Sequence, residues 1–69
     1  MAKNGDSREL IVPEELADAL AADDLALAVF ERLSLSHRRE HANYVADAKH
    51  ADSRTRRANE TVKRLRARA

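Results

Sequence analysis

Residues 52–68 read DSRTRRANETVKRLRAR, and this stretch decides the fold class. Small and apolar side chains recur in it at helical spacing and form one stripe: Ala58, Thr61, Val62 and Leu65. The arginines largely project away from that stripe, which is the pattern of an amphipathic helix. Asp52 or Ser53 is a suitable N-cap, and the cations of the last turn lie where the helix dipole favours positive charge. We therefore expect a helix that needs other helices to cover its stripe.

The segment before this helix also predicts a helix. Ser34-Leu35-Ser36 interrupts the apolar pattern, and Ser36 is a suitable cap for a helix from His37 to about His50. Its inward face would consist of His41, Tyr44, Val45 and Ala48. The short connection to the following helix implies that the two are adjacent and roughly antiparallel.

Two shorter helices are expected earlier in the chain. Val12-Pro13-Glu14-Glu15 has the proline and the paired carboxylates that are typical of a first helical turn. The inward face of this helix would consist of Leu16, Ala17, Leu20 and Ala21. Asp23 is a good N-cap for the next helix. The buried stripe of that helix would consist of Leu25, Ala28, Val29, Phe30 and Leu33.

These segments predict an all-α protein, a compact array of four helices with two short helices before two longer antiparallel ones. Residues 1–9 are polar and show no apolar period, so we expect a disordered N-terminal tail followed by a single helical domain at residues 10–69. One Gly and one Pro in the whole chain leave few turn formers for β-hairpins.

The core of such a domain has to be thin. Hydrophobic residues make up 43% of the chain, but 14 of them are Ala. A domain of this size buries only about 60% of the surface that its unfolded chain exposes. Because the chain contains no Cys, neither a disulfide nor a thiolate metal site compensates. A homodimer would be one way to bury more surface.

No segment has the features of a signal peptide or a membrane span. The N-terminus lacks the apolar stretch of a signal peptide, and the longest aliphatic run, Leu25 to Phe30, is too short to cross a bilayer. We therefore expect a cytoplasmic protein without membrane insertion.

The charges are divided between the two halves of the chain. Residues 1–35 hold eight acidic and three basic residues, a net −5, and residues 36–69 hold four acidic and ten basic residues, a net +6. The acidic half can pair with the basic half within one chain or between chains, and the sequence leaves both arrangements open.

The segment His37-Arg-Arg-Glu40-His41 matches the H-x-x-E-H pattern, in which two His hold zinc and the Glu acts as general base. A catalytic zinc site needs a third protein ligand and a substrate cleft, and the only distant candidate ligand is Glu60. The two arginines between the histidines would also repel a cation. We therefore expect no metal, with His37 at the surface and His41 partly buried.

A first set of cations is a candidate anion or partner-binding site where the third and fourth helices meet. Its members are Arg38, Arg39, Lys49, Arg54 and Arg57. Arginine forks and a helix N-terminus suit phosphate or carboxylate. The competing interpretation is that Arg54 and Arg57 form structural salt bridges to Glu40, Asp47 or carboxylates of the first half.

A second set of cations is a candidate nucleic-acid-binding surface on the last helix. Its members are Arg54, Arg56, Arg57, Lys63, Arg64, Arg66 and Arg68. A cationic helix can contact nucleic-acid phosphates and release their counterions. Helical periodicity spreads these residues around the helix, and Asn59 is thin support for base recognition. The competing interpretation is a solvated helix whose charges pair with the acidic half.

Catalysis is not expected. The chain has no Cys, its serines lie in the tail and at caps, and it contains neither a G-x-S-x-G motif nor a Gly-rich phosphate loop. We expect no enzyme activity, no cofactor and no small-molecule substrate.

The chain resembles a known family over about residues 10–66. The motifs that carry the resemblance are Val12-Pro-Glu-Glu-Leu16, Ser36-His-Arg-Arg-Glu40, Ala48-Lys49, Arg54, Arg56-Arg57 and Thr61-Val62. Their order and spacing are similar to the C-terminal helical module of the YdeI/OmpD-associated family, also described as bacteriocin-protection proteins. In that family the module usually follows a separate N-terminal domain, so this chain resembles a free-standing version.

Four positions depart from the family pattern. That pattern has an aromatic residue where His41 stands, Trp where Tyr44 stands, and Lys/Arg-Pro where His50-Ala51 stands. The resemblance therefore implies a weaker core and a looser joint into the last helix, and it disfavours zinc at His41.

The resemblance also implies a link to bacteriocin tolerance and envelope stress, without a reaction or a ligand. Our leading hypothesis is a small helical module that interacts with proteins. The alternative hypothesis is a nucleic-acid-binding protein that uses its basic C-terminal helix.

Overall fold

The computed structural model describes residues 10–69, and the tail predicted at residues 1–9 lies outside them. The described chain forms four helices and no strand: α2 (Glu14–Ala21), α3 (Asp24–Arg32), α4 (Leu35–Ala46) and α5 (Ala51–Arg66). The predicted all-α class, with two short helices before two longer ones, is confirmed.

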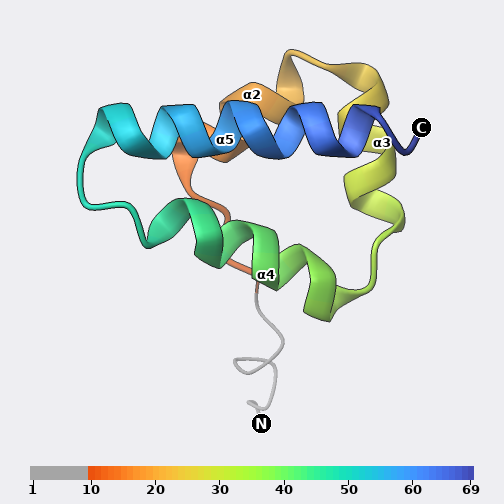
Figure 1. Cartoon of the computed structure of the whole chain (residues 1–69). Coiled ribbons are helices and arrows are strands. Elements are labelled where there is room, and N and C mark those ends of the chain that lie inside the picture. The colour runs from red at the N-terminus through yellow and green to blue at the C-terminus, as the bar shows by residue number, and fades with distance from the viewer. Residues whose placement is uncertain (1–9) are drawn as a thin grey trace, which may run out of the picture.

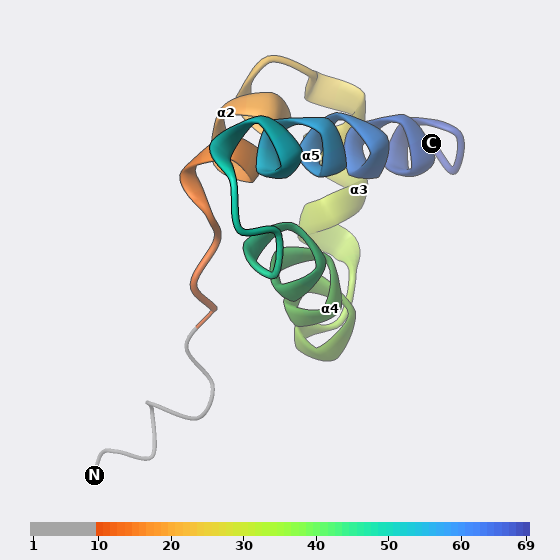
Figure 2. The ribbon, with the colours of Figure 1, turned by 60° about the vertical axis from the view of Figure 1, so that its left-hand side comes forward.

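Helix α5 is the centre of the fold. It packs against α2, α3 and α4, and in Figure 1 it crosses the molecule with α4 running beneath it in the opposite direction. The turned view in Figure 2 shows α3 descending from the level of α2 to the start of α4. The predicted stripe of α5 faces inward, since Ala58, Thr61, Val62 and Leu65 are all buried.

The core is small and follows this stripe. The largest fully buried side chains are Leu16, Val45, Thr61 and Leu65. Leu20, Val29 and Phe30 extend the cluster into α2 and α3. The buried Thr61 hydroxyl donates to the carbonyl oxygen of Arg57 at 2.9 Å, so this polar group in the core is satisfied.

Two helix starts have the predicted chemistry. Helix α2 begins directly after Pro13 with two carboxylates in its first turn. Helix α3 follows Asp23, whose side chain accepts a hydrogen bond from the backbone N–H of Ala26 at 3.1 Å.

Helix α4 begins and ends earlier than the sequence predicts. Its N-cap is Ser34 rather than Ser36, because the hydroxyl of Ser34 accepts from the backbone N–H of His37 at 3.2 Å. Ser34 has the extended backbone of a cap residue, and this start places the half-buried Leu35 inside the first turn. The helix ends at Ala46 rather than near His50, and the buried Ala48 lies in the connection.

Helix α5 also begins before the predicted position. It starts at Ala51, and its N-cap is His50 rather than the predicted Asp52 or Ser53. The side chain of His50 makes no capping hydrogen bond. No helix within residues 10–69 is long and apolar enough to span a membrane.

The expected burial in α2 and α3 was wrong at four positions. The side chains concerned are exposed: Ala17, Ala21, Leu25 and Ala28. Leu25 is 55% exposed, whereas Ala26 is fully buried, so the inward stripe of α3 is shifted by one residue from the predicted start. A small side chain at this contact lets α3 approach its neighbours closely.

Candidate functional site

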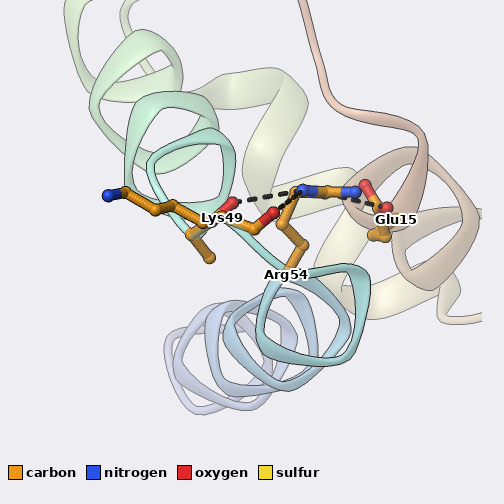
Figure 3. Close-up of polar contacts among 4 residues, drawn as sticks. Glu15, Lys49 and Arg54 are labelled. Carbon is orange, nitrogen blue, oxygen red and sulfur yellow. Dashed lines mark hydrogen bonds and ion pairs between the residues drawn. The ribbon is translucent and has the colours of Figure 1, made fainter.

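Arg54 joins three segments of the chain. Its Nε donates to Oε2 of Glu15 at 3.0 Å, and its Nη1 donates to the carbonyl oxygens of Ala48 and Lys49, each at 3.2 Å (Figure 3). These carbonyls have no helical partner because α4 ends at Ala46. We call this arrangement of Arg54, Glu15, Ala48 and Lys49 the Arg54 junction, and it connects α2, the α4–α5 connection and α5.

The carboxylate of Glu15 is held in its charged form at this junction. A hydrogen bond from the backbone N–H of Glu15 and a second one from Arg54 lower the pKa of Glu15 below its usual value. The partner of Arg54 is therefore a carboxylate of the acidic half, which is one of the structural salt bridges that the sequence left open.

Arg57 and Tyr44 join α5 to α4. Arg57 donates from Nη1 to the carbonyl oxygen of Tyr44 at 2.8 Å, and its guanidinium carbon lies 4.8 Å from the centre of the Tyr44 ring. The Tyr44 hydroxyl donates to Oε1 of Glu60 at 2.6 Å. This hydrogen bond is the main cause that raises the pKa of Tyr44, and burial adds to it.

The structure does not bring the five cations of the candidate anion site together. Arg54 and Arg57 are engaged by the contacts above. The ammonium of Lys49 is exposed and points away from Arg54 in Figure 3. Arg38 and Arg39 lie near the start of α4, whereas Lys49 follows its end, so the length of the helix separates them.

The cations of α5 fall into two groups. Arg54, Arg57 and Arg66 contact other segments, and Nε of Arg66 lies 3.1 Å from Oδ2 of Asp23. The other four members are exposed and form no ion pair within residues 10–69: Arg56, Lys63, Arg64 and Arg68. Asp23 thus caps α3 with one oxygen and holds the last turn of α5 with the other.

The two histidines of the H-x-x-E-H segment lie as expected: His37 is exposed and His41 is half-buried. Nδ1 of His37 is 3.2 Å from the hydroxyl of Ser34. Burial is the main cause that lowers the pKa of His41. Over the described part of the chain, no three His, Cys, Asp or Glu side chains are grouped so that they could hold a metal ion.

A groove of about 280 Å³ lies between α2, α3 and the start of α4, and we call it the α2–α4 groove. Its apolar lining comes from Val12, Ala17, Leu20, Ala21, Leu27 and Phe30, and its charged groups are Glu31 and Arg38. Sequence reasoning missed this groove because it placed Ala17 and Ala21 in the core. No signal in the sequence could have revealed the groove, because its existence depends on how closely three helices pack.

Arg38 is the unsatisfied side chain of this groove. It is half-buried, and its Nε is buried without a hydrogen-bond partner. It forms no ion pair with Glu31 or with any other carboxylate of residues 10–69. Buried donors are nearly always paired, so a buried guanidinium nitrogen without an acceptor needs an explanation, and a ligand that supplies the acceptor is one.

A family model described as Bacteriocin-protection, YdeI or OmpD-Associated matches residues 9–68. The chain belongs to this family. The match confirms the family that the motifs indicate, and it spans all four helices of this YdeI/OmpD-associated chain, including the Arg54 junction and the α2–α4 groove. No curated protein and no solved structure matches the chain.

Proposed function

We propose that this YdeI/OmpD-associated chain is a protein-interaction module that docks a segment of a partner protein in the α2–α4 groove. In this proposal it contributes to bacteriocin protection by contact rather than by catalysis. The observation that carries the proposal is the groove itself, an open and largely apolar surface on a chain of only 69 residues.

The composition of the groove supports a protein partner. Leu20 and Phe30 are buried and form its floor, whereas Ala17 and Ala21 are exposed on α2. Small side chains at the rim allow the backbone of a bound segment to approach closely, and an apolar floor accepts its side chains. Arg54 and Arg57 support the proposal indirectly, because their internal contacts leave them little capacity to bind a ligand.

Site-specific photo-crosslinking tests the docking surface. A photoreactive amino acid replaces Ala21 in the groove, and in a matched control it replaces Asn59, which is exposed on α5. We expect cells that carry the Ala21 variant to yield crosslinked proteins that the Asn59 variant does not yield. Each protein identified by mass spectrometry is then purified and titrated with the unmodified chain.

The deciding variant is Ala21→Trp, which fills the groove with a large side chain. We expect it to weaken binding of the purified partner about tenfold or more, the typical loss when the centre of an interface is altered. Equal binding by the Ala21→Trp variant, or equal crosslinking from both positions, would refute the groove as the docking surface.

A second candidate function rests on the four exposed cations of α5 without ion pairs, and it is binding of nucleic acid. The residues concerned are Arg56, Lys63, Arg64 and Arg68. Titration with a short DNA duplex at low and at moderate salt tests it, because phosphate contacts give affinity that falls steeply with salt. Loss of that affinity when all four are changed to Gln would support this function, and no binding at low salt would exclude it.

A further inference from the structure

The groove has one strongly polar requirement, and it comes from Arg38. Arg38 is the fourth residue of α4, and its side chain lies at the edge of an apolar surface that includes Leu27 and Phe30. Apolar neighbours offer no acceptor, and the buried Nε has none. A bound segment that also lacked an acceptor would enclose this charge further and leave it unpaired, which opposes binding.

The second charge of the groove limits the kind of acceptor. Glu31 is exposed on α3, lines the same groove and does not pair with Arg38. Its negative charge disfavours polyanions such as a phosphate backbone, whereas a single carboxylate beside apolar groups matches one arginine on an apolar surface. Arginine also binds a carboxylate through two parallel hydrogen bonds, which fixes the orientation of the bound group.

We propose that the partner segment carries a carboxylate that pairs with Arg38, next to apolar side chains that pack over Leu27 and Phe30. This inference rests on the proposed function and specifies the chemistry of the partner: an acidic side chain, Asp or Glu, in an otherwise apolar segment. Arg38 selects the segment, and the apolar lining contributes most of the contact area.

Selection of peptides from a random library displays this preference directly. The library is selected in parallel against the wild-type chain, Arg38→Gln, Arg38→Glu and the filled-groove variant Ala21→Trp. We expect the wild type to enrich peptides with Asp or Glu at a fixed spacing from two apolar residues. Arg38→Glu should enrich Lys or Arg at that position, and Ala21→Trp should enrich neither class.

The energetic coupling is then measured on one enriched peptide. Its binding is followed by fluorescence anisotropy, with the acidic residue present or replaced by its amide. For the wild type we expect the amide peptide to bind about tenfold more weakly, as for other charge pairs in partly desolvated interfaces. For Arg38→Gln the two peptides should bind equally. The four combinations of chain and peptide form a double-mutant cycle, in which the same ion pair is removed either from the chain or from the peptide. Circular dichroism checks that each variant is folded.

The outcomes separate the two proposals. Enriched peptides without an acidic preference, or a preference that survives Arg38→Gln, would overturn the carboxylate inference and leave the docking groove intact. Peptides that bind Ala21→Trp as well as the wild type, or no enrichment at all, would overturn the docking groove and with it the inference. A dimer in sedimentation that Ala21→Trp dissociates would show that the occupant is a second copy of this chain, which also overturns the inference.

Discussion

Arg54 and Arg38 occupy the same position in two different helices but differ in their hydrogen-bond partners. Each is half-buried and is the fourth residue of its helix, α5 for Arg54 and α4 for Arg38. The guanidinium of Arg54 donates to a carboxylate and two carbonyl oxygens, while Nε of Arg38 is buried without an acceptor. Residue type and helix position are equal, so the difference comes from what the neighbouring segments present. The contacts of Arg54 hold three segments of the fold together, whereas Arg38 lines the open α2–α4 groove.

The largest expected effect tests whether α5 supports the architecture. Leu65 is 1% exposed, and Leu65→Ala should lower the free energy of unfolding by about 2–5 kcal/mol, the range for leucines in a packed core. Urea unfolding followed by circular dichroism measures the loss. The control Leu25→Ala, at a position that is 55% exposed, should change stability by less than about 0.5 kcal/mol. Similar losses in both variants would contradict the central role of α5.

The next effect compares the two arginines directly. Arg54→Gln should cost about 1–2 kcal/mol, because it removes charged hydrogen bonds at a junction that solvent partly screens. Arg38→Gln should leave stability within about 0.5 kcal/mol of the wild type, since within residues 10–69 the buried Nε of Arg38 has no hydrogen-bond partner and the side chain forms no ion pair. Thermal unfolding of the two variants side by side measures both values. An equal cost for the two substitutions would remove the distinction between junction and groove.

A smaller effect separates the two contacts of Asp23. Asp23→Ala removes both the cap of α3 and the ion pair with Arg66, and it should cost about 1 kcal/mol. Asp23→Asn keeps a capping oxygen and removes only the charge, so the loss should stay below about 0.5 kcal/mol because Arg66 is largely exposed. Chemical denaturation of both variants gives the comparison. If Asn were as costly as Ala, the ion pair rather than the cap would be the stabilising contact.

The smallest effect concerns ionisation at the contact between α4 and α5. The chain has one Tyr and no Trp, so absorbance near 295 nm reports the ionisation of Tyr44 alone. Because the phenol donates to Glu60, its pKa should lie above the ordinary value of 10.0, and Glu60→Gln should bring it closer to that value. A titration that is identical in both proteins would show that the hydrogen bond is absent in solution.

Local signals in the sequence were enough for the fold class and for part of the core. The spacing of Ala58, Thr61, Val62 and Leu65 and the cap at Asp23 are properties of single helices, and the structure has both. Local signals did not decide between Ser34 and Ser36, because each serine could cap a helix; the structure uses Ser34.

The candidate site depended on information that the sequence does not contain. The contact between Glu15 and Arg54 joins residues 39 positions apart, and helical periodicity cannot say which carboxylate meets which arginine. The α2–α4 groove is a gap between three helices, so its existence depends on how closely they pack. Arg38 was among the predicted candidates, but it was assigned to a cluster whose other members the fold places elsewhere.

The central position of α5 has a consequence for folding during synthesis on the ribosome. Helices α2, α3 and α4 contain 8, 9 and 12 residues, and isolated helices shorter than about 12–15 residues are marginal in water. Each of them packs on α5, which is the last of the four to be synthesised. Larger proteins usually fold from the N-terminus during synthesis. In this domain the N-terminal helices have no α5 to pack against at that stage, so they gain little stability from being synthesised first. We therefore expect the domain to fold only once Leu65 has emerged from the ribosome, because the buried stripe of α5 is the surface that the three earlier helices pack against.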